Sequence, residues 1–288
     1  MVLPPSPRML QLFLSSLCFS LTGAATKRLL ESMEAHEAVF LRSLLCTILT
    51  LAMMPRTRAA ILGERTGLLI VRGLLGYAGF QLFVSSLTRI PFPDAAALTY
   101  TSPVVTGLLA ALVLKERFTR KHAAGLLVAL VGVGVVLRPQ LELEWLGGAM
   151  ALGSSLASAF AFIVVRALVR TESPETIVLY FPLVALPISG ALALPHFVWP
   201  VGVEWLWVLA VGVLSQLGQI TMTKALQVAG AGKVSNLSFF SLILTALWST
   251  LFFGEPPSWW VAGGSALIIA GIWVQSLAAV EVRVVVET

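Results

Sequence analysis

The sequence predicts an all-α polytopic membrane protein, in which ten transmembrane helices form two inverted five-helix repeats with both termini in the cytoplasm. Three observations predict this fold: an apolar composition, ten apolar segments of spanning length, and an internal repeat at one fixed offset. Of the 288 residues, 58% are hydrophobic and 11% are charged, against about 45–50% and about 25% in ordinary soluble domains. Lipid is therefore the expected environment of most of the chain. We expect the protein to be an integral protein of the plasma (inner) membrane.

Ten segments have the length and composition of membrane spans. A helix needs about 20 mostly apolar residues to cross roughly 30 Å of hydrocarbon while it satisfies its own backbone hydrogen bonds. The predicted spans are 9–26, 37–54, 67–88, 94–114, 121–138, 146–169, 176–195, 203–224, 234–253 and 259–279. The first span resembles a signal peptide, but we expect it to be retained because it has a counterpart later in the chain.

The basic residues give the orientation. With the N-terminus inside, most of the 19 Lys and Arg residues fall in cytoplasmic segments, as in other membrane proteins. The opposite side holds Lys27, Arg28, Arg89 and Arg138. Both termini are therefore predicted to be cytoplasmic. The basic residues form no patch with interleaved aromatics, so the net charge of +5 does not indicate a nucleic-acid partner.

One fixed offset, which places Ser15 on Ser154, aligns the chain with itself from the first span to the last. The matched positions include Ser15-Ser16-Leu17 with Ser154-Ser155-Leu156, Lys27 with Arg166, Gly73 with Gly212, and Glu116 with Glu255. The predicted repeats are 1–138 and 139–288, joined in one membrane domain. Because each repeat has five spans, an odd number, the second enters the membrane from the opposite side. Inverted repeats of this kind permit alternating access to a site at their interface.

Polar side chains within spans one, three, four, six, eight and nine are the candidate substrate-binding groups. Buried amides without partners are costly, so a polar cavity lined by these six spans would satisfy them. Gln216 and Gln219 lie three apart and are expected to share a helix face. The candidate residues are Ser16, Ser20, Arg72, Tyr77, Gln81, Tyr100, Ser102, Ser155, Ser158, Gln216, Gln219 and Asn236.

Two arginines lie inside predicted spans, Arg42 near the outer end of the second and Arg72 near the inner end of the third. Each is roughly 8 Å from the nearer end of its predicted span, at a helix rise of about 1.5 Å per residue. A long side chain can reach the interface over that distance, which favours an interfacial anchor or an interhelical tie. The alternative is a charge that attracts an anion at the mouth of a cavity.

Proline and glycine distinguish three further spans. Pro103 removes a backbone donor from the fourth span and is expected to break its helix, whereas the repeat counterpart is Leu242. The fifth and tenth spans carry glycines and almost no polar side chains, so we interpret them as packing helices, for support or for contact with a second copy in a homodimer. These glycines are Gly125, Gly132, Gly134, Gly263, Gly264 and Gly271.

The segment from Ala95 to Pro139 resembles the EamA domain of the drug/metabolite transporter superfamily. The resemblance depends on Tyr100-Thr101-Ser102-Pro103, Leu114-Lys115-Glu116 and the glycines from Gly125 to Gly132. A second copy from Gly232 to Gly271, with Phe253-Gly254-Glu255, is similar but lacks the proline. The resemblance covers essentially the whole chain, and it implies a metabolite transporter whose central cavity is formed by the six spans named above. It implies no particular substrate.

The expected function is secondary transport of a small polar or amphipathic metabolite, an amino acid or an organic anion, most simply as export by alternating access. A passive channel and an intramembrane enzyme are the alternatives. An enzyme is disfavoured because the sequence holds no His-Glu-x-x-His pattern and its three histidines lie at span boundaries. No catalytic residue, metal or cofactor is expected, and the expected partners are the substrate and the lipid bilayer.

Overall fold

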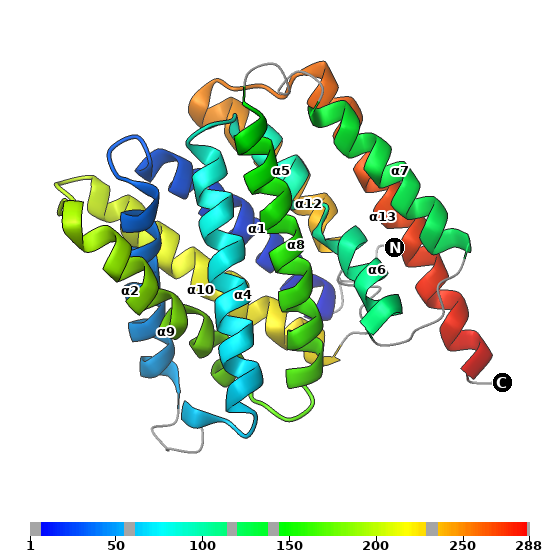
Figure 1. Cartoon of the computed structure of the whole chain (residues 1–288), viewed down its shortest axis with the longest axis horizontal. Coiled ribbons are helices and arrows are strands. Elements are labelled where there is room, and N and C mark those ends of the chain that lie inside the picture. The colour runs from blue at the N-terminus through cyan, green and yellow to red at the C-terminus, as the bar shows by residue number, and fades with distance from the viewer. Residues whose placement is uncertain (1–6, 55–60, 114–119, 138–143, 229–235, 287–288) are drawn as a thin grey trace.

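The computed structural model describes residues 7–54, 61–113, 120–137, 144–228 and 236–286, and its regular elements in these ranges are helices. They pack side by side in one bundle (Figure 1). In chain order they are α1 (Pro7–Leu29), α2 (Ala35–Met53), α4 (Thr66–Leu87), α5 (Phe92–Thr99), α6 (Ser102–Val113), α7 (Arg120–Leu137), α8 (Trp145–Leu168), α9 (Pro174–Ala193), η1 (Leu194–His196), α10 (Glu204–Val228), α12 (Asn236–Phe253) and α13 (Trp259–Val286).

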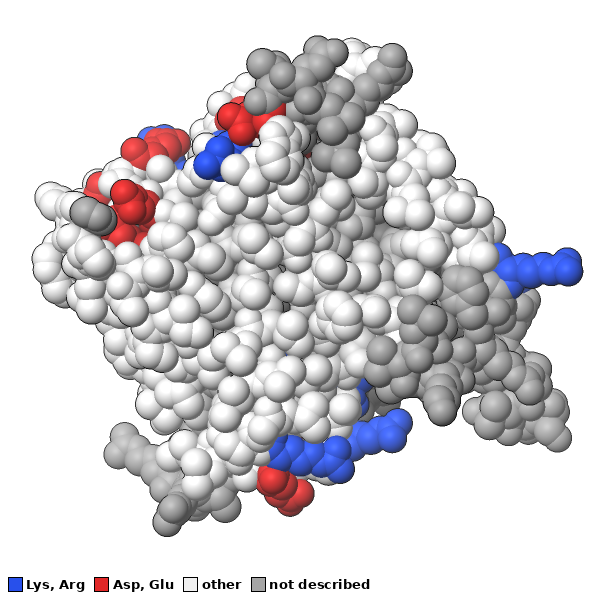
Figure 2. All heavy atoms as spheres, in the orientation of Figure 1, with Lys and Arg blue, Asp and Glu red and all other residues white. Residues whose placement is uncertain are grey.

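The bundle has the surface of a polytopic membrane protein. Within the described residues, α2, α4, α8, α9 and most of α10 are long and apolar enough to cross a membrane. Large apolar side chains are exposed along the bundle, including Ile48, Leu130 and Ile243. Figure 2 shows charged side chains along the rims of one face and an uncharged band between them. Exposed apolar side chains are stable in lipid, so each helix needs to bury only the side that faces its neighbours.

The fourth predicted span, 94–114, is not one continuous helix. It consists of α5 and α6, which are separated at Tyr100 and Thr101. Pro103 lies in the first turn of α6, and without an N–H group it cannot donate to the carbonyl of Thr99. The Thr101 hydroxyl bonds instead to the carbonyl of Leu98 at 2.6 Å. The predicted break is confirmed, and its asymmetry too, because α12 runs unbroken through Leu242.

The main contacts between the two halves of the chain occur in pairs. In each pair, a helix of one half packs on a helix of the other, and their repeat counterparts also pack on each other. Helix α1 packs on α10, and α8, the repeat counterpart of α1, packs on α4. Helix α1 also packs on α12, and its counterpart α8 packs on α5 and α6, which together are the counterpart of α12. Helix α4 packs on α9, and its counterpart α10 packs on α2, the counterpart of α9. The counterparts α2 and α9 contact each other, as do α7 and α13. This pairing is what a two-fold relation between the halves produces.

Helices α7 and α13 lie together at one end of the bundle (Figure 1). Their glycines permit the approach: a Cβ at Gly132 would lie 2.7 Å from the carbonyl oxygen of Gly264, and one at Gly271 would lie 2.5 Å from that of Gly125. The predicted packing role of these two helices is confirmed. Contact with a second copy of the chain stays a prediction.

Adjacent glycines on α13 allow a matched test of this packing. A Cβ at Gly264 would lie 2.5 Å from Cγ2 of Val136, whereas one at Gly263 meets nothing within 4 Å. Gly264→Ala is expected to destabilise the protein by about 1–3 kcal/mol through overpacking. Gly263→Ala is expected to be neutral or stabilising by up to about 1 kcal/mol, because Ala favours the helix. Thermal unfolding in detergent measures both, and equal melting temperatures would contradict the close contact.

Candidate functional site

A cavity of about 190 Å³ lies among the helices of both halves. Its volume is below the roughly 300–1,000 Å³ of sites for drug-sized ligands, so it fits a small solute. The lining comes from all six predicted spans and also from α2 and α9. Its polar members are Thr22, Arg42, Arg72, Thr99, Tyr100, Ser102, Ser154, Ser158, Ser215, Gln219 and Ser241. Its phenylalanines are Phe19, Phe80, Phe83, Phe92, Phe162 and Phe181.

Arg42 is held in the cavity wall by three neighbours. Its side chain is 2% exposed, and its Nε donates a hydrogen bond of 2.7 Å to Oγ of Ser215 on α10. Its guanidinium carbon lies 4.1 Å from the ring centroid of Phe80 and 4.4 Å from that of Phe181. Aromatic rings attract a cation most strongly when water is excluded. The contacts therefore fix the guanidinium plane inside the protein.

Arg72 approaches the ring of Phe181 from α4. It is 4% exposed, its Nη2 donates to Oε1 of Gln219 at 3.2 Å, and its guanidinium carbon lies 5.4 Å from the centroid of Phe181. Gly76, one turn along α4, leaves room for the guanidinium, because a Cβ there would collide with Nη1 of Arg72. The side chain thus lies along its own helix toward α10.

The arginines are not exposed on the surface of the bundle. Both are buried in the bundle, so the interpretation as interfacial anchors is wrong. The interhelical tie is confirmed, because Arg42 joins α2 to α10 and Arg72 joins α4 to α10. Among the described residues, Nη1 of Arg42 and Nε of Arg72 are buried and have no hydrogen-bond partner. Each guanidinium therefore retains a donor that no described residue satisfies.

Five of the eleven candidate residues whose side chains the structure describes lie in the cavity wall. They are Arg72, Tyr100, Ser102, Ser158 and Gln219. They come from α4, the α5–α6 break, α8 and α10, so segments distant in the sequence meet at one place. Tyr100 and Ser102 lie at the break between α5 and α6, and both line the cavity.

Several other candidates have partners within the protein and lie outside this lining. Ser20 accepts a hydrogen bond from Nε1 of Trp248 at 3.1 Å, and Ser155 pairs with the hydroxyl of Thr101 at 2.8 Å. These contacts connect helices. Ser16 is buried and Tyr77 is half-buried, and neither contributes to the lining.

The candidate glutamines have different hydrogen-bond partners. Nε2 of Gln216 donates to Oγ1 of Thr50 on α2 at 2.6 Å, away from the cavity, although Gln219 three residues later reaches it. Nε2 of Gln81 donates to Oγ of Ser85 on its own helix at 3.3 Å. The side chain of Asn236 lies outside the described residues.

The aromatic part of the site was not predicted, and Arg42 was not among the predicted site residues. Phenylalanines are common on lipid-facing surfaces, so nothing in the sequence separates Phe80 and Phe181 from the others. A signal did exist in the repeat, where the counterpart of Arg42 is Phe181 and that of Phe80 is Gln219. Positions related in this way can converge at the interface of inverted halves.

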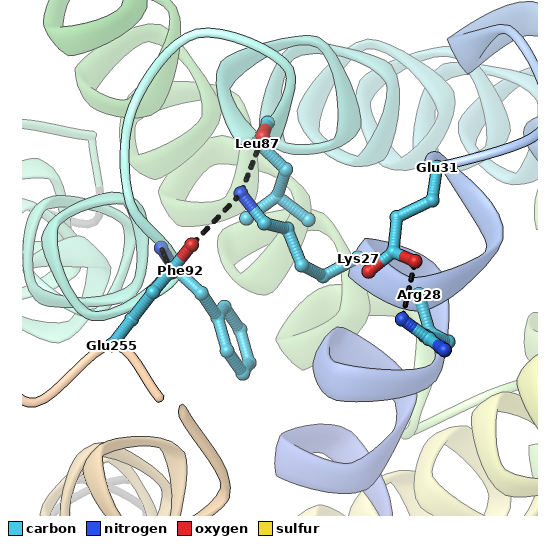
Figure 3. Close-up of polar contacts among 6 residues, drawn as sticks. All are labelled: Lys27, Arg28, Glu31, Leu87, Phe92 and Glu255. Carbon is cyan, nitrogen blue, oxygen red and sulfur yellow. Dashed lines mark hydrogen bonds and ion pairs between the residues drawn. The ribbon is translucent and has the colours of Figure 1, made fainter. Parts of the chain in front are cut away.

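A polar cluster lies beside the cavity lining, which it contacts through the backbone of Phe92 (Figure 3). The ammonium of Lys27 lies 3.3 Å from the carbonyl oxygen of Leu87 and 3.7 Å from the carboxylate of Glu255. That carboxylate also accepts a hydrogen bond of 3.3 Å from the backbone N–H of Phe92. Phe92 is fully buried, lines the cavity and packs on Gly23. The cluster therefore ties the ends of α1 and α4 to the start of α5 and to the segment before α13.

The other end of α4 is held differently. Oε1 of Glu172 accepts hydrogen bonds from the backbone N–H groups of Glu64 and Arg65, at 2.8 and 2.6 Å. The hydroxyl of Tyr180 donates to the carbonyl of Leu62 at 2.9 Å. A carboxylate at the start of a helix satisfies donors that the helix leaves free. Glu116, the repeat counterpart of Glu255, lies outside the described residues.

Comparison with known proteins identifies relatives over most of the chain. The EamA-like transporter family matches residues 7–138 and 145–277. A pseudopaline exporter of Pseudomonas aeruginosa is 31% identical over 262 residues, covering 90% of this chain and 92% of the exporter. Solute carrier family 35 member G1 of Homo sapiens is 24% identical over 89% of this chain and 75% of its own length. A riboflavin transporter of Vibrio cholerae is 29% identical over 75% of this chain and 73% of its own length.

A solved protein structure shares the fold. It superposes with a TM-score of 0.72 over 96% of this chain and 99% of its own chain, at 24% sequence identity. At that level of identity the likeness concerns the fold alone.

Proposed function

The chain belongs to the EamA-like transporter family, and on that premise we propose that it is a secondary transporter that exports a small metabolite by alternating access. The family and its relatives make it a multi-pass membrane transporter rather than an enzyme. The proposed substrate class is a small polar or amphipathic metabolite, an amino acid or an organic anion. The proposed division is two inverted repeats, 1–138 and 139–288, with cytoplasmic termini.

The observation that carries the proposal is the position of the cavity between the two halves. Arg42 and Phe80 come from the first half, and their repeat counterparts in the second half are Phe181 and Gln219. All four line the cavity, and Arg42 lies over the ring of its own counterpart, Phe181. Residues related by the repeat therefore meet at the cavity wall. A site on the axis between inverted repeats can stay in place while the halves exchange conformations around it.

Export is proposed because the relative that is 31% identical is named an exporter and is matched over 92% of its length. Alternating access is supported by the paired helix contacts and by the cluster around Lys27. We propose that this cluster holds the predicted non-cytoplasmic end of the cavity closed through Phe92. In the proposed transport cycle, the Lys27–Glu255 contact separates when that end opens.

Accessibility of a cysteine in the cavity tests the proposal. Both native cysteines, Cys18 and Cys46, are buried and can be replaced by Ala, so that Ser158→Cys in the cavity wall is the single thiol. We expect a membrane-impermeant maleimide to label this thiol from either side of the membrane, and a transported solute to protect it. Labelling from one side only, under all solute conditions, would argue against alternating access.

The closing cluster gives a second prediction. Glu255→Gln is expected to raise the labelling rate of Ser158→Cys from the predicted non-cytoplasmic side about two- to fivefold, since a partly exposed ion pair contributes up to about 1 kcal/mol. The matched control is Glu31→Gln, because Glu31 pairs with Arg28 on the exposed surface beside the cluster (Figure 3). Equal rates for the two variants would show that the Lys27–Glu255 contact does not hold this end closed.

A further inference from the structure

We propose that the substrate is a small organic dianion with two carboxylates, one bound by Arg42 and the other by Arg72. The inference rests on the proposed transport function and narrows its substrate class. The two arginines then determine which substrate is bound, and the faces of Phe80 and Phe181 form the apolar surface beside them.

The first argument is charge. Arg42 and Arg72 are 2% and 4% exposed, and the described lining of the cavity includes no Asp or Glu. The buried carboxylates of the described bundle are engaged elsewhere: Glu37 accepts from the N–H of Val198 at 2.7 Å, and Glu172 accepts from backbone groups at the start of α4. Buried charges without a counter-charge are costly. A ligand with two negative charges would neutralise both.

The second argument is the unused donors. Arg42 uses Nε for Ser215, and Arg72 uses Nη2 for Gln219. Nη1 of Arg42 and Nε of Arg72 are buried without a partner among the described residues. A guanidinium presents its N–H groups as a planar fork that matches the two oxygens of a carboxylate. Both guanidinium groups are oriented by these contacts before a ligand arrives, which reduces the entropy lost on binding.

The third argument is distance. The guanidinium carbons of Arg42 and Arg72 lie 4.4 and 5.4 Å from the centroid of the same Phe181 ring. The separation of the two carbons therefore cannot exceed the sum of these two distances. A bidentate carboxylate carbon lies roughly 4 Å from a guanidinium carbon, given N···O distances of about 2.8 Å. A short dicarboxylate can therefore reach both arginines at once.

The same features disfavour an amino-acid zwitterion. Its carboxylate could bind one arginine, but its ammonium would enter a wall that has two positive charges and, among the described residues, no carboxylate. Like charges in a water-poor site repel strongly. Within the amino acids and organic anions of the proposed function, the cavity therefore favours the organic anions.

Equilibrium binding to the purified full chain in detergent tests the inference, with succinate as the dianion. Succinamate replaces one carboxylate by an amide, butyrate removes it, and alanine is the zwitterion. Succinate is expected to bind at least about tenfold more tightly than each of the others, because an unpaired buried charge remains in their complexes. Equal binding of butyrate or alanine, or equal competition by chloride or sulfate, would overturn the inference.

Single variants test the role of each arginine. Arg42→Gln and Arg72→Gln are each expected to bind succinate and succinamate about equally, since only one positive charge remains. The exposed Arg170 supplies the control, and Arg170→Gln should keep the wild-type preference. Arg72→Lys, which keeps the charge, should keep part of it. If both Gln variants fold, as judged by thermal unfolding, and still prefer succinate as strongly as the wild type, the assignment is wrong.

Binding and flux separate this inference from the proposed function. Tight succinate binding without transport would support the dianion site and overturn the carrier. Saturable transport of a zwitterion or a neutral solute, without succinate binding, would keep the carrier and overturn the dianion site.

Discussion

Replacing Arg72 by Met is expected to reduce saturable transport by about 30-fold or more while leaving the melting temperature unchanged or higher. The loss follows from removal of a buried charge that contacts the ligand, a change that typically costs about 2–5 kcal/mol of binding. The unchanged or higher stability follows because an apolar side chain of similar length avoids burying an uncompensated charge. Arg72 is 4% exposed, and its side chain is hydrogen-bonded to Gln219.

Transport in proteoliposomes and thermal unfolding in detergent, measured on the same preparation, check this prediction. Arg170→Met is the control, since Arg170 lies on the exposed surface. A residue that only ties α4 to α10 would give the opposite result, with a lower melting temperature and transport retained in the folded fraction.

Replacing Phe181 by Leu is expected to weaken substrate binding about tenfold. Phe181 faces both guanidinium groups, and desolvated cation–π contacts are worth up to about 2 kcal/mol each. Leu keeps an apolar side chain at the position but has no aromatic face to orient the arginines. Phe83→Leu is the matched control, because Phe83 also lines the cavity, whereas the rings that stack on Arg42 and Arg72 are those of Phe80 and Phe181. Equal effects of the two changes on the dissociation constant would contradict this role for Phe181.

The helices and their approximate ends were predictable because membrane spans need long apolar segments, and these are visible in the sequence. The glycines of α7 and α13 also indicated packing correctly, since a missing Cβ permits close approach whatever the partner. Pro103 indicated the position of the break in the fourth span. Each of these features depends on local chemistry, which the sequence shows directly.

The site was only partly predictable because it depends on which side each residue faces. Gln216 and Gln219 are three residues apart, yet one bonds to Thr50 and the other reaches the cavity. The convergence of Arg42 and Arg72 on Phe181 depends on the packing of α2, α4 and α9. Local sequence does not specify that packing, so in the sequence the arginines are two separate intramembrane charges.

Counterflow in proteoliposomes tests the central claim, a carrier with a central dianion site, most directly. Vesicles loaded with unlabelled succinate are diluted into labelled succinate, and the label inside is followed over time. We expect a transient accumulation that saturates with succinate concentration and is absent in Arg72→Met, because a carrier exchanges one solute for another through a single site. Linear, unsaturable entry without accumulation, equal in wild type and variant, would contradict the account.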